Sequence, residues 1–241
     1  MSGVPLLVRA HLASGIAHAG PWGIALDGLL AAELWADRKA AVRDAGELAP
    51  ALHDVDEPED LPLPLERCVT STGLWHWAAT CAYPEHRASD APEVRYWTGR
   101  ADHSALEALA EGFPASLSDR QGRYRARYMP LLVTVCRSVV WRGVGDLERI
   151  TELLKPVAAI GKKRSAGEGQ VLAWEITPTP DEPWSAAHLH PDGALGRPVP
   201  EECLRGRSVV DDGGVGPAGI RPPYMHQARQ HQLRLPALLD G

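Results

Sequence analysis

The sequence predicts an α+β fold, and three features support this prediction. Apolar residues make up 44% of the 241 residues, enough to bury a core in one large domain or two small ones. Segments of strand-like composition occur in a mixed order with segments whose leucines recur at helical spacing. A glycine-rich loop with three consecutive basic residues separates the last helical segment from the last strand-like one.

The first two elements are predicted to be a strand over residues 4–12 and a helix over residues 26–44. The strand segment reads VPLLVRAHL. In the helical segment, Leu26, Leu30 and Leu34 recur at intervals that place them on one face. The chain therefore opens with a strand followed by a helix.

An acidic loop and a long insertion are expected next. Residues 44–66 hold eight Asp and Glu and no Lys or Arg, and their prolines disfavour regular structure. Such a run is usually a solvated loop, and a docking surface for a basic neighbour is the alternative. Residues 68–83 and 94–100 are rich in aromatic and β-branched residues. They suit a long hairpin or a thumb-like insertion, and we assign about residues 68–120 to such an insertion.

A second long strand region is predicted over residues 123–141. At its start Arg123, Arg125 and Arg127 alternate with tyrosine and alanine, so an extended chain would place three guanidinium groups on one face. We expect these arginines and the adjacent Tyr128 to contact RNA, because guanidinium planes and aromatic rings both stack on bases.

The last predicted elements complete a recognisable order. Asp146 is expected to cap a helix over residues 147–155, and QVLAWEI (170–176) is expected to be the final strand. Strand, helix, strand, strand, helix, strand is the ferredoxin-like (RRM-like) βαββαβ pattern. We assign residues 1–176 to this domain, and residues 177–241, with ten prolines, to a loop-rich C-terminal extension packed on it.

The loop over residues 161–169 favours a phosphate-bearing partner. Glycine permits positive φ and close approach of a ligand, and three adjacent cations repel one another unless an anion or solvent screens them. The loop is neither a Walker loop nor a dinucleotide loop, because those follow a strand and open a helix. The net charge of −6 does not exclude such a partner, since residues 120–174 carry eleven Lys and Arg against four acids.

Five stretches of the chain together resemble a known family. They are PLLVRAHLAS (5–14), LDGLLAAEL (26–34), IGKKRSAGEGQV (160–171), RPVP (197–200) and RPPYM (221–225). A glycine-rich loop before the last strand of a ferredoxin-like domain is similar to that of the RAMP superfamily of CRISPR-associated proteins, which use it to hold guide RNA. Its combination with LDGLLA and RPPY resembles the type IV CRISPR effector subunit at the 5′-handle end of the guide.

The resemblance implies a non-catalytic subunit without a cofactor. It would bind the 5′ repeat-derived handle of the crRNA and cap a filament of backbone subunits, with the large and small subunits as further partners. Six loop residues would contact the RNA backbone: Gly161, Lys162, Lys163, Arg164, Gly167 and Gly169. Glu168 is an acid at an inner position of this loop, where phosphate would prefer a neutral residue.

Two other functions stay open. Related RAMP endonucleases carry a catalytic histidine after the first strand, and His18 lies in that connection, so a metal-independent crRNA-processing endoribonuclease is the first alternative. The acidic surplus outside residues 120–174 and the eight tryptophans motivate the second, a protein-interaction adaptor without RNA contact.

No metal site is expected. The four cysteines lie far apart in the sequence without a CxxC pair, which is typical of reduced thiols. The HLH stretch at 188–190 and Cys203 could supply three ligands, but no second cysteine accompanies them. In the WHW stretch at 75–77, Trp75 and Trp77 share one strand face with His76 opposite, which favours packing in a core or an interface.

The chain is expected to be cytoplasmic. Arg9 interrupts the only apolar stretch near the amino terminus, so no signal peptide is indicated. Nowhere do about 18 consecutive apolar residues occur, so no membrane association is predicted.

Overall fold

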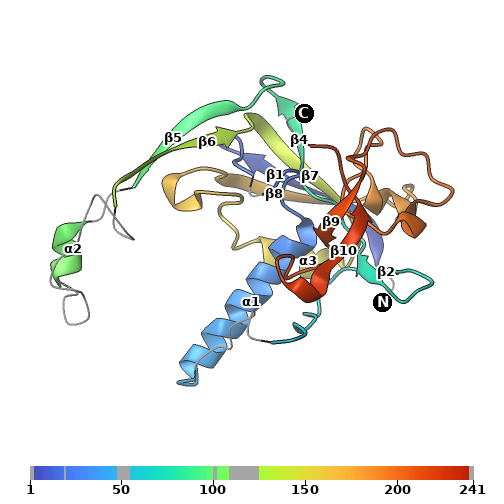
Figure 1. Cartoon of the computed structure of the whole chain (residues 1–241), viewed down its shortest axis with the longest axis horizontal. Helices are drawn as coiled ribbons and strands as arrows, with labels where there is room; N and C mark the ends of the chain where they lie inside the picture. Colours follow the sequence, from blue (N-terminus) through green and yellow to red (C-terminus); the bar gives the residue numbers. More distant parts are fainter. Residues whose placement is uncertain (1–2, 19, 48–54, 100–101, 109–124, 239–241) are drawn as a thin grey trace.

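The computed structural model of the chain describes residues 3–18, 20–47, 55–99, 102–108 and 125–238 (Figure 1). It is a mixed α+β structure whose central element is a four-stranded antiparallel sheet. None of the helices in these ranges is long and apolar enough to cross a membrane.

The central sheet has the order β4-β7-β1-β8, and all its pairs are antiparallel. Its strands are β1 (Val4–Leu12), β4 (Tyr83–Arg87), β7 (Cys136–Gly145) and β8 (Val171–Pro178). In β1, buried and half-buried side chains alternate, as expected for a strand whose two faces meet different surroundings. The predicted opening strand is confirmed.

Two helices cover one face of this sheet. They are α1 (Leu26–Asp44) and α3 (Leu147–Leu154), and their leucines and isoleucine pack with the inward side chains of β1 in one apolar core. Asp146 caps α3 by accepting a hydrogen bond from the Arg149 amide (3.1 Å). Both predicted helices are confirmed. Only the first part of α1 is buried, and its remaining turns extend away from the body (Figure 1).

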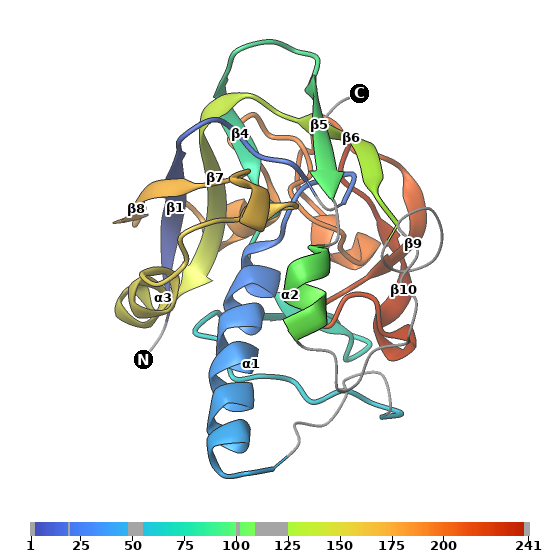
Figure 2. The ribbon, with the colours of Figure 1, turned by 90° about the vertical axis from the view of Figure 1, so that its left-hand side faces the viewer.

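A two-stranded arm projects from the sheet on the side that faces the viewer in Figure 2. It consists of β5 (Glu93–Gly99) and β6 (Arg127–Val133), and α2 (His103–Ala108) lies beyond its outer end. The expectation of one strand over residues 123–141 is wrong, because the chain leaves the arm at Thr134, which exchanges backbone hydrogen bonds with Ile16. β7 then starts at Cys136.

Of the two readings of residues 68–83 and 94–100, the single long hairpin is also wrong. β2 (Arg67–Val69) pairs with β3 (Trp75–Trp77) in a short hairpin, whereas β5 pairs with β6. Between these hairpins, β4 forms the edge of the central sheet and lies within the range assigned to the insertion.

The segment after β8 is rich in turns and wraps around the hairpin and the sheet. It contains the 3₁₀ turns η3 (Trp184–His188), η4 (Glu201–Leu204) and η5 (Gln227–Arg229), and the ribbon of β9 (Val215–Gly219) with β10 (Gln230–Arg234). Ala187 packs with Val144 of β7, so η3 covers part of the sheet face opposite the helices.

A buried charged network joins this segment to α1. The Arg197 guanidinium, 1% exposed, donates hydrogen bonds to the carbonyls of Ala79 (2.8 Å) and Ile220 (2.9 Å) and lies 3.4 Å from the Asp27 carboxylate. The Tyr224 hydroxyl donates to the other Asp27 oxygen (2.5 Å). One residue from each of LDGLLA, RPVP and RPPYM, namely Asp27, Arg197 and Tyr224, therefore takes part in a single network.

The described part of the acidic loop is held by internal ion pairs. Asp60 accepts hydrogen bonds from Arg221 (2.9 Å) and Arg229 (2.8 Å), which both belong to the C-terminal segment. Residues 48–54 of the loop lie outside the described ranges. Part of the acidic run therefore has a basic neighbour within the same chain.

Candidate nucleic-acid interface

The glycine-rich loop is closed at its neck by backbone hydrogen bonds. The Ile160 amide donates to the Gly169 carbonyl (2.9 Å), and the Val171 amide donates to the Ala158 carbonyl (2.9 Å). Gly169 has φ +66°, and a Cβ there would lie 1.8 Å from the Ile160 carbonyl oxygen. Glycine is required at this position because the two arms of the neck approach so closely.

The connection between β1 and α1 supports one side of the loop. The Lys162 amide donates to the Ala17 carbonyl (2.7 Å). Gly161, at φ +83°, lies so close that a Cβ would be 2.5 Å from the same oxygen. The connection between β1 and α1 thus holds the backbone of the loop at Gly161 and Lys162.

The outer part of the loop is open to solvent. Lys162 and Arg164 are exposed, and within the described residues neither side chain takes part in an ion pair. Lys163 has a left-handed backbone (φ 58°), and a short 3₁₀ turn, η2 (Arg164–Ala166), follows it. Gly167, at φ +90°, has no heavy atom within 4 Å of where a Cβ would lie. A ligand can therefore approach the backbone of the loop at this point.

The β5–β6 arm lies against the loop. The Lys163 ammonium is 3.3 Å from the centroid of the Trp97 ring, a cation–π contact. Arg95 donates to the Glu168 carboxylate (2.8 Å), and that side chain is only 14% exposed. The one acid of the loop is therefore paired with an arm residue, which offsets its negative charge.

The arm residues proposed from the strand pattern fall on different surfaces. Strand register places Arg127 opposite Gly99, on the face that carries Trp97 and meets the loop. Tyr128 lies on the other face and stacks on Tyr96, with ring centroids 4.7 Å apart and planes 4° apart. Arg125 precedes β6 and is exposed, and Arg123 lies outside the described residues. The structure brings Arg127 to the loop's side of the arm and leaves Tyr128 on the far side.

A groove at the base of the arm was not predicted from the sequence. Its volume is about 620 Å³, and it is lined by Ser14, His86, Arg87 and Arg137, among others. It adjoins the loop, because the Ala13 amide donates to the Gln170 carbonyl (3.0 Å) at the end of the loop. Three separate segments form this groove, so no single stretch of sequence signals it.

Arg9 lies on the sheet face opposite the helices, where two acidic side chains offset its charge. Arg9 forms ion pairs with Glu85 (2.8 Å) and Glu175 (3.2 Å). Burial alone would raise the pKa of Glu85, but hydrogen bonds from Arg9 and Ser138 more than offset it and lower the pKa. The arginine of the opening strand is therefore engaged within the protein.

His18 is half-buried in the connection that supports the loop. Its neighbour Ala17 accepts the hydrogen bond from Lys162. The residue proposed for the endoribonuclease alternative thus directly follows a residue that contacts the loop.

Comparison with known proteins gives one result that covers almost the whole chain. Residues 4–236 match the family model described as "CRISPR type IV associated protein Csf3". No protein in the curated collection matches the sequence.

Proposed function

The chain belongs to the Csf3 family of type IV CRISPR-associated proteins, and on this premise we propose that it holds the 5′ handle of the crRNA and caps the backbone filament without catalysing a reaction. Its partners would be the handle RNA, the backbone subunits and the large and small subunits of the same ribonucleoprotein.

We infer a ferredoxin-like core for this subunit. Along the chain, β1, α1, β4, β7, α3 and β8 follow in the order strand, helix, strand, strand, helix, strand. Read from the other edge, the sheet order is β8-β1-β7-β4. The first of the four strands therefore lies between the fourth and the third, and the second forms an edge. The β2–β3 hairpin and the β5–β6 arm are then insertions into this core.

The observation that carries the proposal is the open tip of the loop over residues 161–169. Lys162 and Arg164 are exposed and free of internal ion pairs in the described structure, and Gly167 leaves room for close approach. Exposed cations and uncovered backbone amides suit the phosphates of a single strand. The pairing of Glu168 with Arg95 keeps its negative charge from opposing that contact.

The groove at the base of the arm extends the proposed RNA path. Arg137 lines the groove and is exposed. The arm borders the loop through the contact of Trp97 with Lys163. A strand that crosses the loop tip would enter the groove at the base of the arm in one direction and reach Arg127, near the outer end of the arm, in the other. Because phosphate contacts fix position without reading sequence, recognition of particular handle bases would be a task for groove residues.

Crosslinking in the assembled particle tests this function. The chain is coexpressed with the other subunits and a CRISPR array, the particle is irradiated, and crosslinked peptides and the retained RNA are identified. We expect crosslinks between residues 160–170 and nucleotides of the 5′ handle. Crosslinks of the handle only to other subunits would refute the proposal, and an RNA with a scrambled handle serves as the control.

The endoribonuclease is kept as a second candidate because the chain before His18 contacts the loop directly. Incubation of labelled repeat RNA with the protein and a chelator distinguishes the two functions. Cleavage at one position that His18→Ala abolishes and His11→Ala preserves would favour the enzyme. We expect intact RNA with all three proteins.

A further inference from the structure

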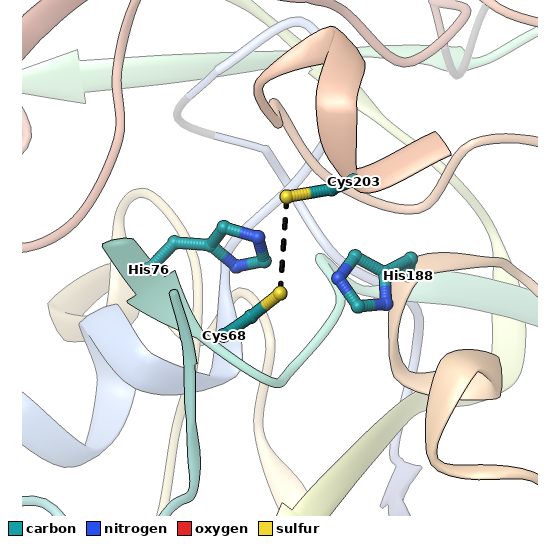
Figure 3. A group of neighbouring side chains, drawn as sticks. All are labelled: Cys68, His76, His188 and Cys203. Atoms are coloured by element: carbon teal, nitrogen blue, oxygen red, sulfur yellow. Dashed lines mark hydrogen bonds between the residues drawn. The ribbon is translucent and has the colours of Figure 1, made fainter. Parts of the chain in front are cut away.

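Four potential metal ligands from distant parts of the chain meet at the β2–β3 hairpin (Figure 3). They are Cys68, His76, His188 and Cys203, and one ligand atom from each lies within 4.8 Å of all the others. No contact described for the loop or the groove involves these side chains, so the cluster is separate from the proposed RNA path.

The fold positions these four side chains firmly. Cys68 and His76 are directly opposite each other in the β2–β3 pairing, while His188 ends η3 and Cys203 lies in η4. Both histidines are fully buried, and Cys203 is 9% exposed. Ligands from a hairpin and from two turns more than a hundred residues later thus converge on one shielded point.

The spacing of the two sulfur atoms fits a tetrahedral zinc ion. The Cys68 and Cys203 Sγ atoms are 3.8 Å apart. Two zinc–sulfur bonds of about 2.3 Å at a tetrahedral angle place the sulfurs about 3.8 Å apart. A disulfide would require about 2.05 Å, so the observed pair is not positioned as a bonded cystine.

The histidines present unsatisfied ring nitrogens to the same point. His76 Nδ1 lies 2.9 Å from the Trp77 carbonyl and donates to it, which leaves a lone pair on Nε2. His188 Nδ1 lies 3.2 Å from the Ser185 carbonyl and 3.0 Å from the Arg207 guanidinium. In the described structure, both Nε2 atoms are buried without a hydrogen-bond partner. Figure 3 shows one nitrogen of each ring facing the sulfurs.

Such orphaned nitrogens are costly unless something binds them. A buried polar atom without a partner loses its hydration and gains nothing in return. A zinc-bound histidine characteristically donates its other ring N–H to a backbone carbonyl, as Nδ1 of His76 does. Two thiolates would also cancel the charge of a divalent ion, which makes the complete site neutral and suited to burial.

We propose that Cys68, His76, His188 and Cys203 bind one Zn²⁺ in a closed structural site that fastens the β2–β3 hairpin to the C-terminal segment. Tetrahedral coordination by two sulfurs and two nitrogens is typical of zinc, and four protein ligands leave no position for a substrate. This proposal departs from the expectation of no metal site. The sequence indicated His188 and Cys203, but the second cysteine is Cys68, far away in the chain, and His190 lies instead against the Tyr83 ring (centroids 5.0 Å apart).

Metal analysis of the purified full-length chain tests the proposal. After incubation with zinc and desalting, we expect one zinc per chain by mass spectrometry of the elements. Replacement by Co²⁺ should give the charge-transfer and d–d bands of a tetrahedral site with two thiolates. The double variant Cys68→Ser/Cys203→Ser should lose both signals, whereas Cys136→Ser and His190→Gln, which change buried residues outside the cluster, should keep them.

A measurement on the unmodified chain covers the case in which ligand variants fold poorly. Removal of the metal with a chelator should lower the Tm and make two further thiols reactive toward a thiol reagent, and added zinc should reverse both changes. Zinc content no higher than that of the double variant would overturn the proposal. A cobalt spectrum without thiolate bands, or a Cys68–Cys203 disulfide in the freshly purified protein, would overturn it equally.

Discussion

The double variant Lys162→Ala/Arg164→Ala should weaken handle binding in a salt-dependent way. Both side chains are exposed and make no internal ion pair in the described structure, so both charges are available to phosphates. Each phosphate contact to a single strand contributes about −0.7 to the slope of log K against log salt. Loss of both contacts should therefore make the slope less steep by about 1.4.

This change in slope sets how the affinity ratio varies with salt. If salt rises from about 50 to about 200 mM, the advantage of the wild-type chain over the double variant should shrink about sevenfold, since four to the power 1.4 is about 7. Lys163→Ala alone should change the slope by less than about 0.7, because its ammonium lies on the Trp97 ring.

Fluorescence anisotropy with a labelled 5′-handle RNA measures these slopes. The charge-matched control is Lys39→Ala/Arg43→Ala, which removes two exposed cations from the outer part of α1, away from the loop (Figure 1). The reasoning is refuted if the loop variant keeps the wild-type slope, or if the control flattens it equally. Absence of measurable binding by the wild-type chain would favour the adaptor alternative.

Three further perturbations separate binding from folding. Gly167→Val should reduce RNA affinity with a stability loss of only about 1–2 kcal/mol, since the site is open and only the left-handed backbone is strained. Gly169→Ala should lower the Tm much more, because its Cβ would clash with the Ile160 carbonyl in the neck of the loop. Thermal unfolding and anisotropy measure both variants, and equal Tm losses would contradict this prediction. Arg197→Met leaves a buried carboxylate uncompensated and should cost about 3–5 kcal/mol in urea unfolding; a cost under about 1 kcal/mol would show that the network contributes little. Arg95→Ala should weaken handle binding by freeing the charge of Glu168, and adding Glu168→Gln should restore it; failure of this rescue in anisotropy would mean that Arg95 acts in another way.

Elements with a clear local pattern could be predicted from the sequence. The strand over residues 4–12 and the helix over residues 26–44 have the predicted bounds, because alternation and leucine spacing are properties of a single segment. The Asp146 cap is equally local, since its side chain bonds an amide three residues ahead.

Pairings between distant segments could not be predicted in this way. The apolar pattern runs from β6 into β7 without a glycine or proline at the junction, and only the bridge between Thr134 and Ile16 separates the two strands. The partner of β5 is likewise about 30 residues further along the chain, across a segment without a strong turn signal.

The position and composition of the loop were predictable, but the separate contacts of its residues were not. Its glycines and cations indicated a phosphate contact, and that remains a prediction. The structure distinguishes Gly169, which packing requires, from Gly167, which faces solvent. It also assigns Lys163 and Glu168 to contacts with the arm, which depend on side chains 66 and 73 residues away. No spacing rule within the loop could have shown these partners.

The network of Asp27, Arg197 and Tyr224 has a consequence for how the surface of this protein could change. Three of the stretches that make the chain recognisable meet in this network, whereas Lys162 and Arg164, in another such stretch, face solvent. Substitutions at those two cations could therefore alter the proposed RNA surface of this chain while the buried network stays the same.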